Sequence, residues 1–231
     1  MTSPTVPAEA QQQTVAPAAV EAARYALLRR LAPAMRHHLV VNLQPIGMLH
    51  EVMDRRLRAA EPDLAKLHEG VHKINGFARA ALQSSIDMVT WLAPEEGAVT
   101  TVADGVRECM GLVATGLGFR GYALRHEAAD VPGTVGRAAL RNVLTAALLH
   151  LTDEATPPAD LVLQAQARDH GLELQLQRIA TTGDAGFSVD LGYRPLARAD
   201  LEALAAAEAV ALVCEAASIR LTLAWVQPPA A

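Results

Sequence analysis

The sequence predicts an α+β protein, in which an N-terminal antiparallel helical hairpin precedes a domain whose helices cover one side of a mostly antiparallel sheet. Three observations support this fold class. Strong helix formers with apolar residues spaced three and four apart fill residues 18–92. A turn-rich segment, Ala93–Gly97, separates them from residues 98–226. In that second block, segments that alternate apolar and polar residues stand between helical ones.

Each predicted helix of the hairpin carries an apolar stripe. With residues placed at intervals of 100°, the first stripe falls within roughly 120°, and it consists of Leu28, Leu31, Met35, Leu39, Leu43, Ile46, Leu49, Met53 and Leu57. Glu61-Pro62-Asp63 ends the first helix. The second stripe consists of Leu64, Leu67, Val71, Ile74, Ala78, Ala81, Leu82, Val89 and Leu92. Because a lone hairpin would leave these stripes in water, we expect a homodimer in which two hairpins form a four-helix bundle.

The second block contains three predicted helices and three predicted strands. The helices cover Val102–Gly116, Val135–Leu151 and Ala199–Ala217. Leu161–Ala167 and Leu172–Gln177 are predicted to form a hairpin, and Ile219–Val226 is predicted to be a closing strand. Trp91 and Trp225 each end an element, which favours a role as core or interface anchors.

Composition excludes several classes of protein. The net charge of −5 gives no electrostatic reason to expect a nucleic-acid partner, and no apolar run is long enough to span a membrane. Residues 1–17, rich in Pro, Ala, Gln and Thr, lack the layout of a signal peptide and are predicted to be a disordered leader, while residues 227–231 form a tail. Cys109 and Cys214 are predicted to be buried thiols in a reducing compartment, so we expect a cytoplasmic protein.

His37 is the candidate reactive residue because it lies nearly opposite the centre of the first stripe. Aliphatic residues grouped about an outward histidine are unusual on a solvated helix face. The predicted docking surface consists of Arg36, Val40, Val41, Gln44 and Met48. A neutral imidazole is a nucleophile suited to reversible phosphoryl transfer. The alternative interpretation is a surface histidine beside incidental valines.

Two segments resemble motifs of histidine kinases. The stretch His37–Ile46 is similar to the H-box, with His37, Leu39, Asn42, Leu43 and Ile46 in register. Leu140–Leu148 is similar to the N-box helix of the kinase ATP-binding domain. The order of elements over residues 20–226 follows the same family, so the resemblance implies a dimerisation hairpin followed by an ATPase-like α/β sandwich.

The departures from the family pattern concern the nucleotide site. The N-box asparagine expected to hold Mg²⁺ falls at Ala146, the nucleotide-binding aspartate at Arg178, and the glycine-rich lid at Ala203–Ala207. An Asp-x-Gly fragment at Asp184–Gly186 stands late and lacks the next glycine, and His38 replaces the acidic neighbour of the phosphorylated histidine. These losses imply a degenerate domain that does not bind ATP usefully.

The chain therefore resembles the ChpT-type histidine phosphotransferases, which are built on a degenerate kinase frame. The resemblance implies that His37 accepts a phosphoryl group from the aspartate of one response-regulator receiver domain and passes it to another. The protein would need no cofactor of its own, because the receiver brings Mg²⁺. One alternative is a pseudo-histidine-kinase scaffold that docks a response regulator or a kinase without being phosphorylated; another is ATP binding through an atypical site.

Three histidines of the predicted hairpin have a spacing that a zinc ion could use. His68 and His72 are spaced four apart, and the hairpin register brings His50 near His72. No cysteine or carboxylate clearly completes the set, so no metal site is predicted.

Overall fold

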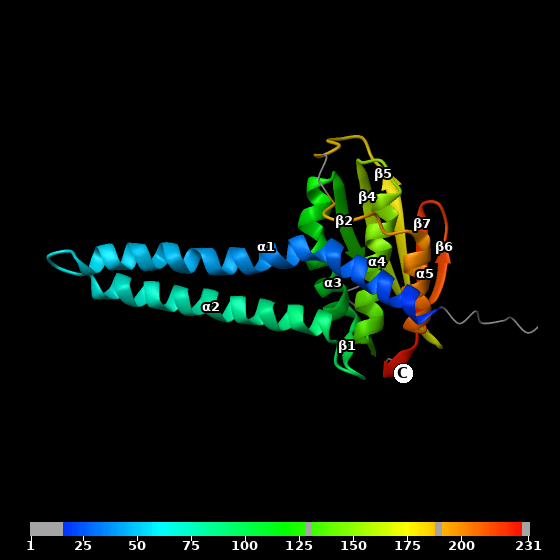
Figure 1. The fold of residues 1–231 in the computed structure, drawn as a ribbon, viewed down its shortest axis with the longest axis horizontal. Helices are drawn as coiled ribbons and strands as arrows, with labels where there is room; N and C mark the ends of the chain where they lie inside the picture. Colours follow the sequence, from blue (N-terminus) through cyan, green and yellow to red (C-terminus); the bar gives the residue numbers. More distant parts are fainter. Residues whose placement is uncertain (1–15, 128–130, 188–190, 228–231) are drawn as a thin grey trace, which may run out of the picture.

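The computed structural model describes residues 16–127, 131–187 and 191–227. It consists of a long helical hairpin and an α/β domain (Figure 1). The start of the first hairpin helix and the end of the second lie beside this domain, and the turn between the helices lies far from it. The α+β prediction is confirmed. Residues 1–15 of the predicted leader and residues 228–231 of the predicted tail lie outside the described part of the chain.

Helix α1 spans Pro17–Leu57 and helix α2 spans Leu64–Leu92. Pro17 occupies the first turn of α1, where its missing N–H would have had no partner inside the helix. The carboxylate of Asp63 caps α2 by accepting a hydrogen bond from the backbone N–H of Lys66 at 3.1 Å. The predicted turn between the helices is thus confirmed, and the two helices pack against each other along their length.

The second domain contains a five-stranded sheet with the order β2-β4-β5-β7-β6. Its strands are β2 (Tyr122–Glu127), β4 (Ala159–Arg168), β5 (Gly171–Ala180), β6 (Ala211–Cys214) and β7 (Ser218–Leu223). Only the β2–β4 pair is parallel among these described strands. The predicted hairpin is confirmed as β4–β5, which extends further than expected because the register runs without a break from Ala159↔Ala180 to Arg168↔Gly171.

A second sheet and three helices complete the domain. The small sheet has the order β1 (Val99–Thr101), β3 (Thr134–Gly136), β8 (Trp225–Gln227). The helices are α3 (Val102–Phe119), α4 (Arg137–Asp153) and α5 (Arg198–Ala207). Alternate residues of β4 and β5, including Leu161, Leu163, Leu174 and Leu176, are buried on the face that these helices cover.

The structure corrects two predicted elements at the C-terminal end. The helix expected over Ala199–Ala217 ends at Ala207, and residues Ala211–Cys214 form the edge strand β6. Pairing of β6 with β7 satisfies the backbone groups of this segment and overrides the helical pattern of the alanine-rich residues 203–211 that lead into it. The closing strand expected over Ile219–Val226 is divided at Ala224, and its two parts join different sheets.

Both tryptophans have the predicted anchoring role. Trp91 is buried at the end of α2, where the guanidinium of Arg141 lies 5.2 Å from the centre of its ring. The indole N–H of Trp225 donates to the carbonyl oxygen of Arg168 at 2.9 Å. Cys109 is buried and Cys214 half-buried, and both are free thiols. Within the described ranges, no helix has the length and apolar character needed to cross a membrane.

The first half of α1 crosses the helical layer of the second domain and packs on α5, α3 and α4 (Figure 1). Its buried residues are Ala23, Ala26, Leu27, Arg30, Leu31 and Met35. Of the predicted apolar stripe of α1, only Leu31 and Met35 are fully buried, while Leu43 and Leu57 are more than half exposed. The stripe alone therefore did not predict which face of α1 enters the core.

Candidate functional site

His37 lies on the face of α1 that packs against the second domain two turns earlier. Placed at 100° per residue, Ala23, Ala26, Arg30 and His37 fall within about 60° of one another. Ala23, Ala26 and Arg30 are buried under the second domain, whereas His37 is exposed. The outward direction predicted for His37 is therefore correct, but the second domain covers other residues on the same face of α1.

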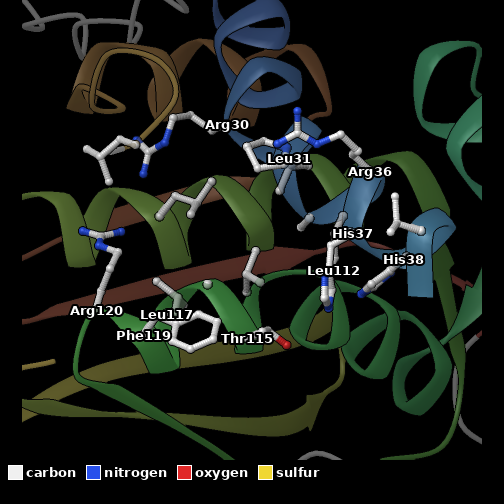
Figure 2. Close-up of a pocket in the computed structure, with 17 residues that line it drawn as sticks. Arg30, Leu31, Arg36, His37, His38, Leu112, Thr115, Leu117, Phe119 and Arg120 are labelled. Atoms are coloured by element: carbon white, nitrogen blue, oxygen red, sulfur yellow. The ribbon is translucent and has the colours of Figure 1, made fainter. Parts of the chain in front are cut away.

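A cavity of about 450 Å³ separates His37 from helix α3. Its walls come from α1, α3, the second half of α4 and the segment between β5 and α5. The lining includes Arg36, His37, His38, Val40, Leu112, Thr115, Gly116, Phe119, Leu149 and Leu191. Figure 2 shows the imidazoles of His37 and His38 directed from α1 toward the turn of α3 that carries Leu112 and Thr115. The reactive candidate thus stands beside a cavity between the two domains.

The predicted docking residues divide into two groups. Arg36 and Val40 line the cavity with His37. Val41, Gln44 and Met48 lie further along α1 and are exposed, with exposed fractions of 49% for Val41 and 61% for Met48. The structure therefore leaves all five side chains accessible, but it brings only the first two to the cavity.

His38 is half-buried and also lines the cavity, with its ring centroid 6.4 Å from that of His37. Its carbonyl oxygen accepts a hydrogen bond from the side-chain amide of Asn42 at 2.9 Å. The same amide nitrogen lies 3.4 Å from the hydroxyl of Ser84 on α2. Asn42 therefore ties the turn that follows His38 to the second helix of the hairpin.

A buried charge cluster, which the sequence did not indicate, fixes α1 on the second domain beside the cavity. The carboxylate of Asp153 accepts hydrogen bonds from both terminal nitrogens of Arg30, one of them at 2.8 Å. It also forms an ion pair with Arg120 at 3.1 Å and accepts a hydrogen bond from the backbone N–H of Leu196 at 3.0 Å. The side chains of Arg30 and Asp153 are 3% and 0% exposed. Arg30 lies on the same face of α1 as His37, and this ion pair holds it in the interface with the second domain.

The positions where the family pattern expects nucleotide ligands have structural roles here. Ala146 is fully buried within α4. The guanidinium of Arg178 donates to the carbonyl oxygens of Leu151 at 3.0 Å and Ala216 at 3.2 Å. The segment Ala203–Ala207 is the second half of helix α5, with Ala203 and Ala205 in the core. These side chains stabilise the fold and offer no oxygen ligand to a metal ion.

The Asp184-Ala185-Gly186 fragment forms a turn that packs on the start of β2. The carboxylate of Asp184 accepts from the backbone N–H of Gly186 at 2.9 Å. Gly186 has φ +68°, and a Cβ there would lie 2.4 Å from the backbone nitrogen of Gly121. Only glycine allows this close approach.

Of the three candidate zinc ligands, His68 and His72 form a pair on α2, with 2.9 Å between their Nε2 atoms, and His50 lies on α1. In the described part of the chain, no group of three or more His, Cys, Asp or Glu side chains could hold a metal ion.

Comparison with known proteins gives similarity of fold only. No protein-family model matches the chain, and no curated protein matches it in sequence. Among solved structures, a histidine kinase from Burkholderia phymatum STM815 has 16% identity and a TM-score of 0.42, covering 92% of this chain and 99% of its own. A bacterial phosphotransferase has 11% identity and a TM-score of 0.38, covering 91% of this chain and 98% of its own. The catalytic domain of the histidine kinase ThkA has 11% identity and a TM-score of 0.40, covering 58% of this chain and 100% of its own.

Proposed function

We propose that the protein is a histidine phosphotransferase of a two-component phosphorelay, with His37 as the residue that carries the phosphoryl group. The observation that carries the proposal is an exposed imidazole in an H-box-like stretch of α1, with exposed Val40, Val41 and Met48 on the same side of the helix. Accessible aliphatic side chains around a nucleophile are typical of a surface that a partner protein covers.

The proposed reaction is a reversible transfer between a carboxylate and an imidazole. The unprotonated ring nitrogen of His37 attacks the phosphorus of an aspartyl phosphate on a receiver domain. A nitrogen–phosphorus bond forms while the phosphorus–oxygen bond to the aspartate breaks, and the carboxylate leaves with the electron pair. The other ring nitrogen releases its proton, and the reverse steps pass the group to a second receiver. The receiver supplies the Mg²⁺ that neutralises the charge on the phosphoryl oxygens.

A homodimer in the cytoplasm is part of the proposal. In the single chain, Leu43, Leu64, Val71, Leu82, Val89 and Leu92 of the hairpin are all more than half exposed. A second hairpin that covers these side chains would complete a four-helix bundle. Because His37 points away from the predicted stripe, it would stay accessible in that dimer.

The sequence and the structural roles of Ala146, Arg178 and Ala203–Ala207 favour phosphotransfer over autophosphorylation from ATP. His38 at the position of the usual acidic neighbour favours the same choice, because it provides no carboxylate next to the nucleophile. The scaffold alternative shares these observations and differs only in whether His37 reacts.

Transfer of labelled phosphate tests the proposal. Receiver domains from the same genome, carrying ³²P on their aspartate, are mixed with the full chain, and label on the chain is followed over time. We expect label on the unmutated protein and on His50→Gln, a matched control because His50 is another exposed histidine of α1. The amount of label on His37→Ala and on His37→Gln should be at least 100-fold lower than on the unmutated protein.

Two other outcomes would contradict the proposal. Receiver binding by the unmutated chain without any transfer of label would indicate the scaffold. Label taken directly from γ-labelled ATP would show that the second domain still works as a kinase.

A further inference from the structure

We infer that the cavity between α1 and α3 binds a small amphipathic anion, with an aliphatic body and a carboxylate head. Its volume of about 450 Å³ lies within the range of about 300–1,000 Å³ found for small-molecule sites. Binding at this cavity would be a property of the chain independent of phosphotransfer. Its consequence for His37, which is inhibition of the relay, rests on the proposed function.

The floor of the cavity is apolar and rigid. Leu31 of α1, Leu112 and Leu117 of α3 and Leu149 of α4 line it, and each of these side chains is buried in the core of the protein. Phe119 stands at the edge with 57% of its surface exposed. A flexible aliphatic chain that enters the cavity would replace water on these walls, which is favourable in proportion to the apolar area covered.

The titratable side chains that line the cavity, among the described residues, are all basic. Arg30, Arg36, Arg120, His37 and His38 contribute to its lining, and none of the described lining residues is acidic. Arg30 and Arg120 share the single negative charge of Asp153. Arg36 has no hydrogen-bond or ion-pair partner in the described residues, so its guanidinium is available to a carboxylate. This charge distribution favours an anion over a neutral ligand or a cation.

Helix α3 leaves the cavity open because its wall carries Gly116. A Cβ built on Gly116 meets no described heavy atom within 4 Å, so a larger side chain at this position would enter the cavity. Gly111 on the same helix also has free space around a Cβ, but it is not part of the lining. The two glycines therefore provide a matched pair of variants, one that fills the cavity and one that does not.

An anion bound here would lie against His37. Figure 2 shows the His37 ring directed into the space between α1 and the turn of α3 at Leu112 and Thr115. A carboxylate held by Arg36 would occupy the approach that a receiver aspartate needs. The ligand and the phosphorylated receiver should therefore compete for the same space.

Fluorescence of 1-anilinonaphthalene-8-sulfonate with the full chain tests this inference, with decanoate and decan-1-ol as competitors. We expect decanoate to displace the probe at least tenfold more effectively than decan-1-ol. Gly116→Leu should weaken the binding of both the probe and decanoate at least tenfold. The affinities of Gly111→Leu should stay within twofold of those of the unmutated protein. Arg36→Gln should remove most of the preference for decanoate over decan-1-ol. Circular dichroism melting curves establish that the variants are folded.

Equal probe binding by Gly116→Leu and Gly111→Leu would overturn the inference, as would equal displacement by decanoate and decan-1-ol. The binding experiment contains no phosphate donor, so its result is separate from the test of His37. If His37 transfers label, decanoate should slow that transfer in the Gly111→Leu variant, whose cavity is not filled. If His37 does not transfer label, the binding result still decides whether the cavity is an anion site.

Discussion

The two halves of helix α1 have opposite environments. In the half that crosses the second domain, Ala23, Ala26 and Leu27 are at most 1% exposed. In the half that extends away with α2, Leu43 and Leu57 are 52% and 56% exposed. His37 stands where one environment changes into the other. One regular helix can thus be part of the core at one end and exposed at the other, depending on what lies against it.

The inner half also contains charged residues, which a core helix rarely buries without partners. Arg30 enters the interface because Asp153 neutralises it. Arg24, on a neighbouring exposed face, pairs with Glu208, which also accepts a hydrogen bond from Asn142 of α4. The inner half is thus attached to the second domain by polar contacts as well as by packing, whereas the outer half packs against α2.

The largest effect should come from Asp153→Ala. Removal of this carboxylate leaves the buried guanidinium of Arg30 without a counter-charge, which costs about 3–5 kcal/mol of unfolding free energy. Urea denaturation followed by circular dichroism measures this loss. Arg24→Gln is the control, because its partly exposed pair with Glu208 should cost less than about 1 kcal/mol. A loss below 1 kcal/mol for Asp153→Ala would show that the charge cluster does not hold α1.

The next effect compares a leucine from each half. Leu27→Ala leaves a cavity in the core and should cost about 2–5 kcal/mol. Leu43→Ala should change the unfolding free energy of separated chains by less than about 0.5 kcal/mol, but it should weaken self-association measured by sedimentation. If Leu43→Ala leaves the association unchanged, the exposed stripe of the hairpin is not the dimer interface.

The smallest effect concerns the ion pair between Arg194 and Asp200, and it depends on pH. The side chain of Arg194 donates two hydrogen bonds to Asp200 at the start of α5, and these bonds hold the pKa of that carboxyl below its usual value of 3.8. Since the folded pKa is lowered, the stabilisation is present above about pH 4 and is lost as the pH falls through the folded value. Asp200→Asn should therefore cost about 1–2 kcal/mol at pH 7 and progressively less toward pH 2 in urea denaturation. A cost that stays constant over this range would contradict an ionic origin.

A contrasting case is the thiol of Cys109, which needs no partner of opposite charge. Complete burial raises the pKa of Cys109 to about 12. The thiol therefore stays protonated and apolar in character near neutral pH, consistent with its place in the core between α3 and α4.

Part of the candidate site follows from local sequence. The direction of His37 could be predicted because the 3.6-residue period relates it to Leu28–Leu57 without knowledge of any other element. The β4–β5 hairpin could be predicted because both strands alternate around a short turn. The cavity could not be predicted, because its far wall on α3 is placed by contacts between residues distant in the chain.

The remaining corrections have the same physical origin. The strand character of Ala211–Cys214 depends on pairing with β7, because the alanine-rich residues before it extend a helical pattern into this segment. The burial of Arg30 depends on Asp153, which lies 123 residues further along the chain. A charged side chain has no periodic signature that reveals whether a distant partner will neutralise it.

The sequence by itself determined the α+β class, the long hairpin and the outward direction of His37, because these depend on short-range periodicity and on residue identity. Only the tertiary structure decided which end of α1 is core, which charges are buried and that a basic, apolar cavity lies beside His37. Those features arise from contacts between distant segments, whose free energy depends on a geometry that local sequence does not encode.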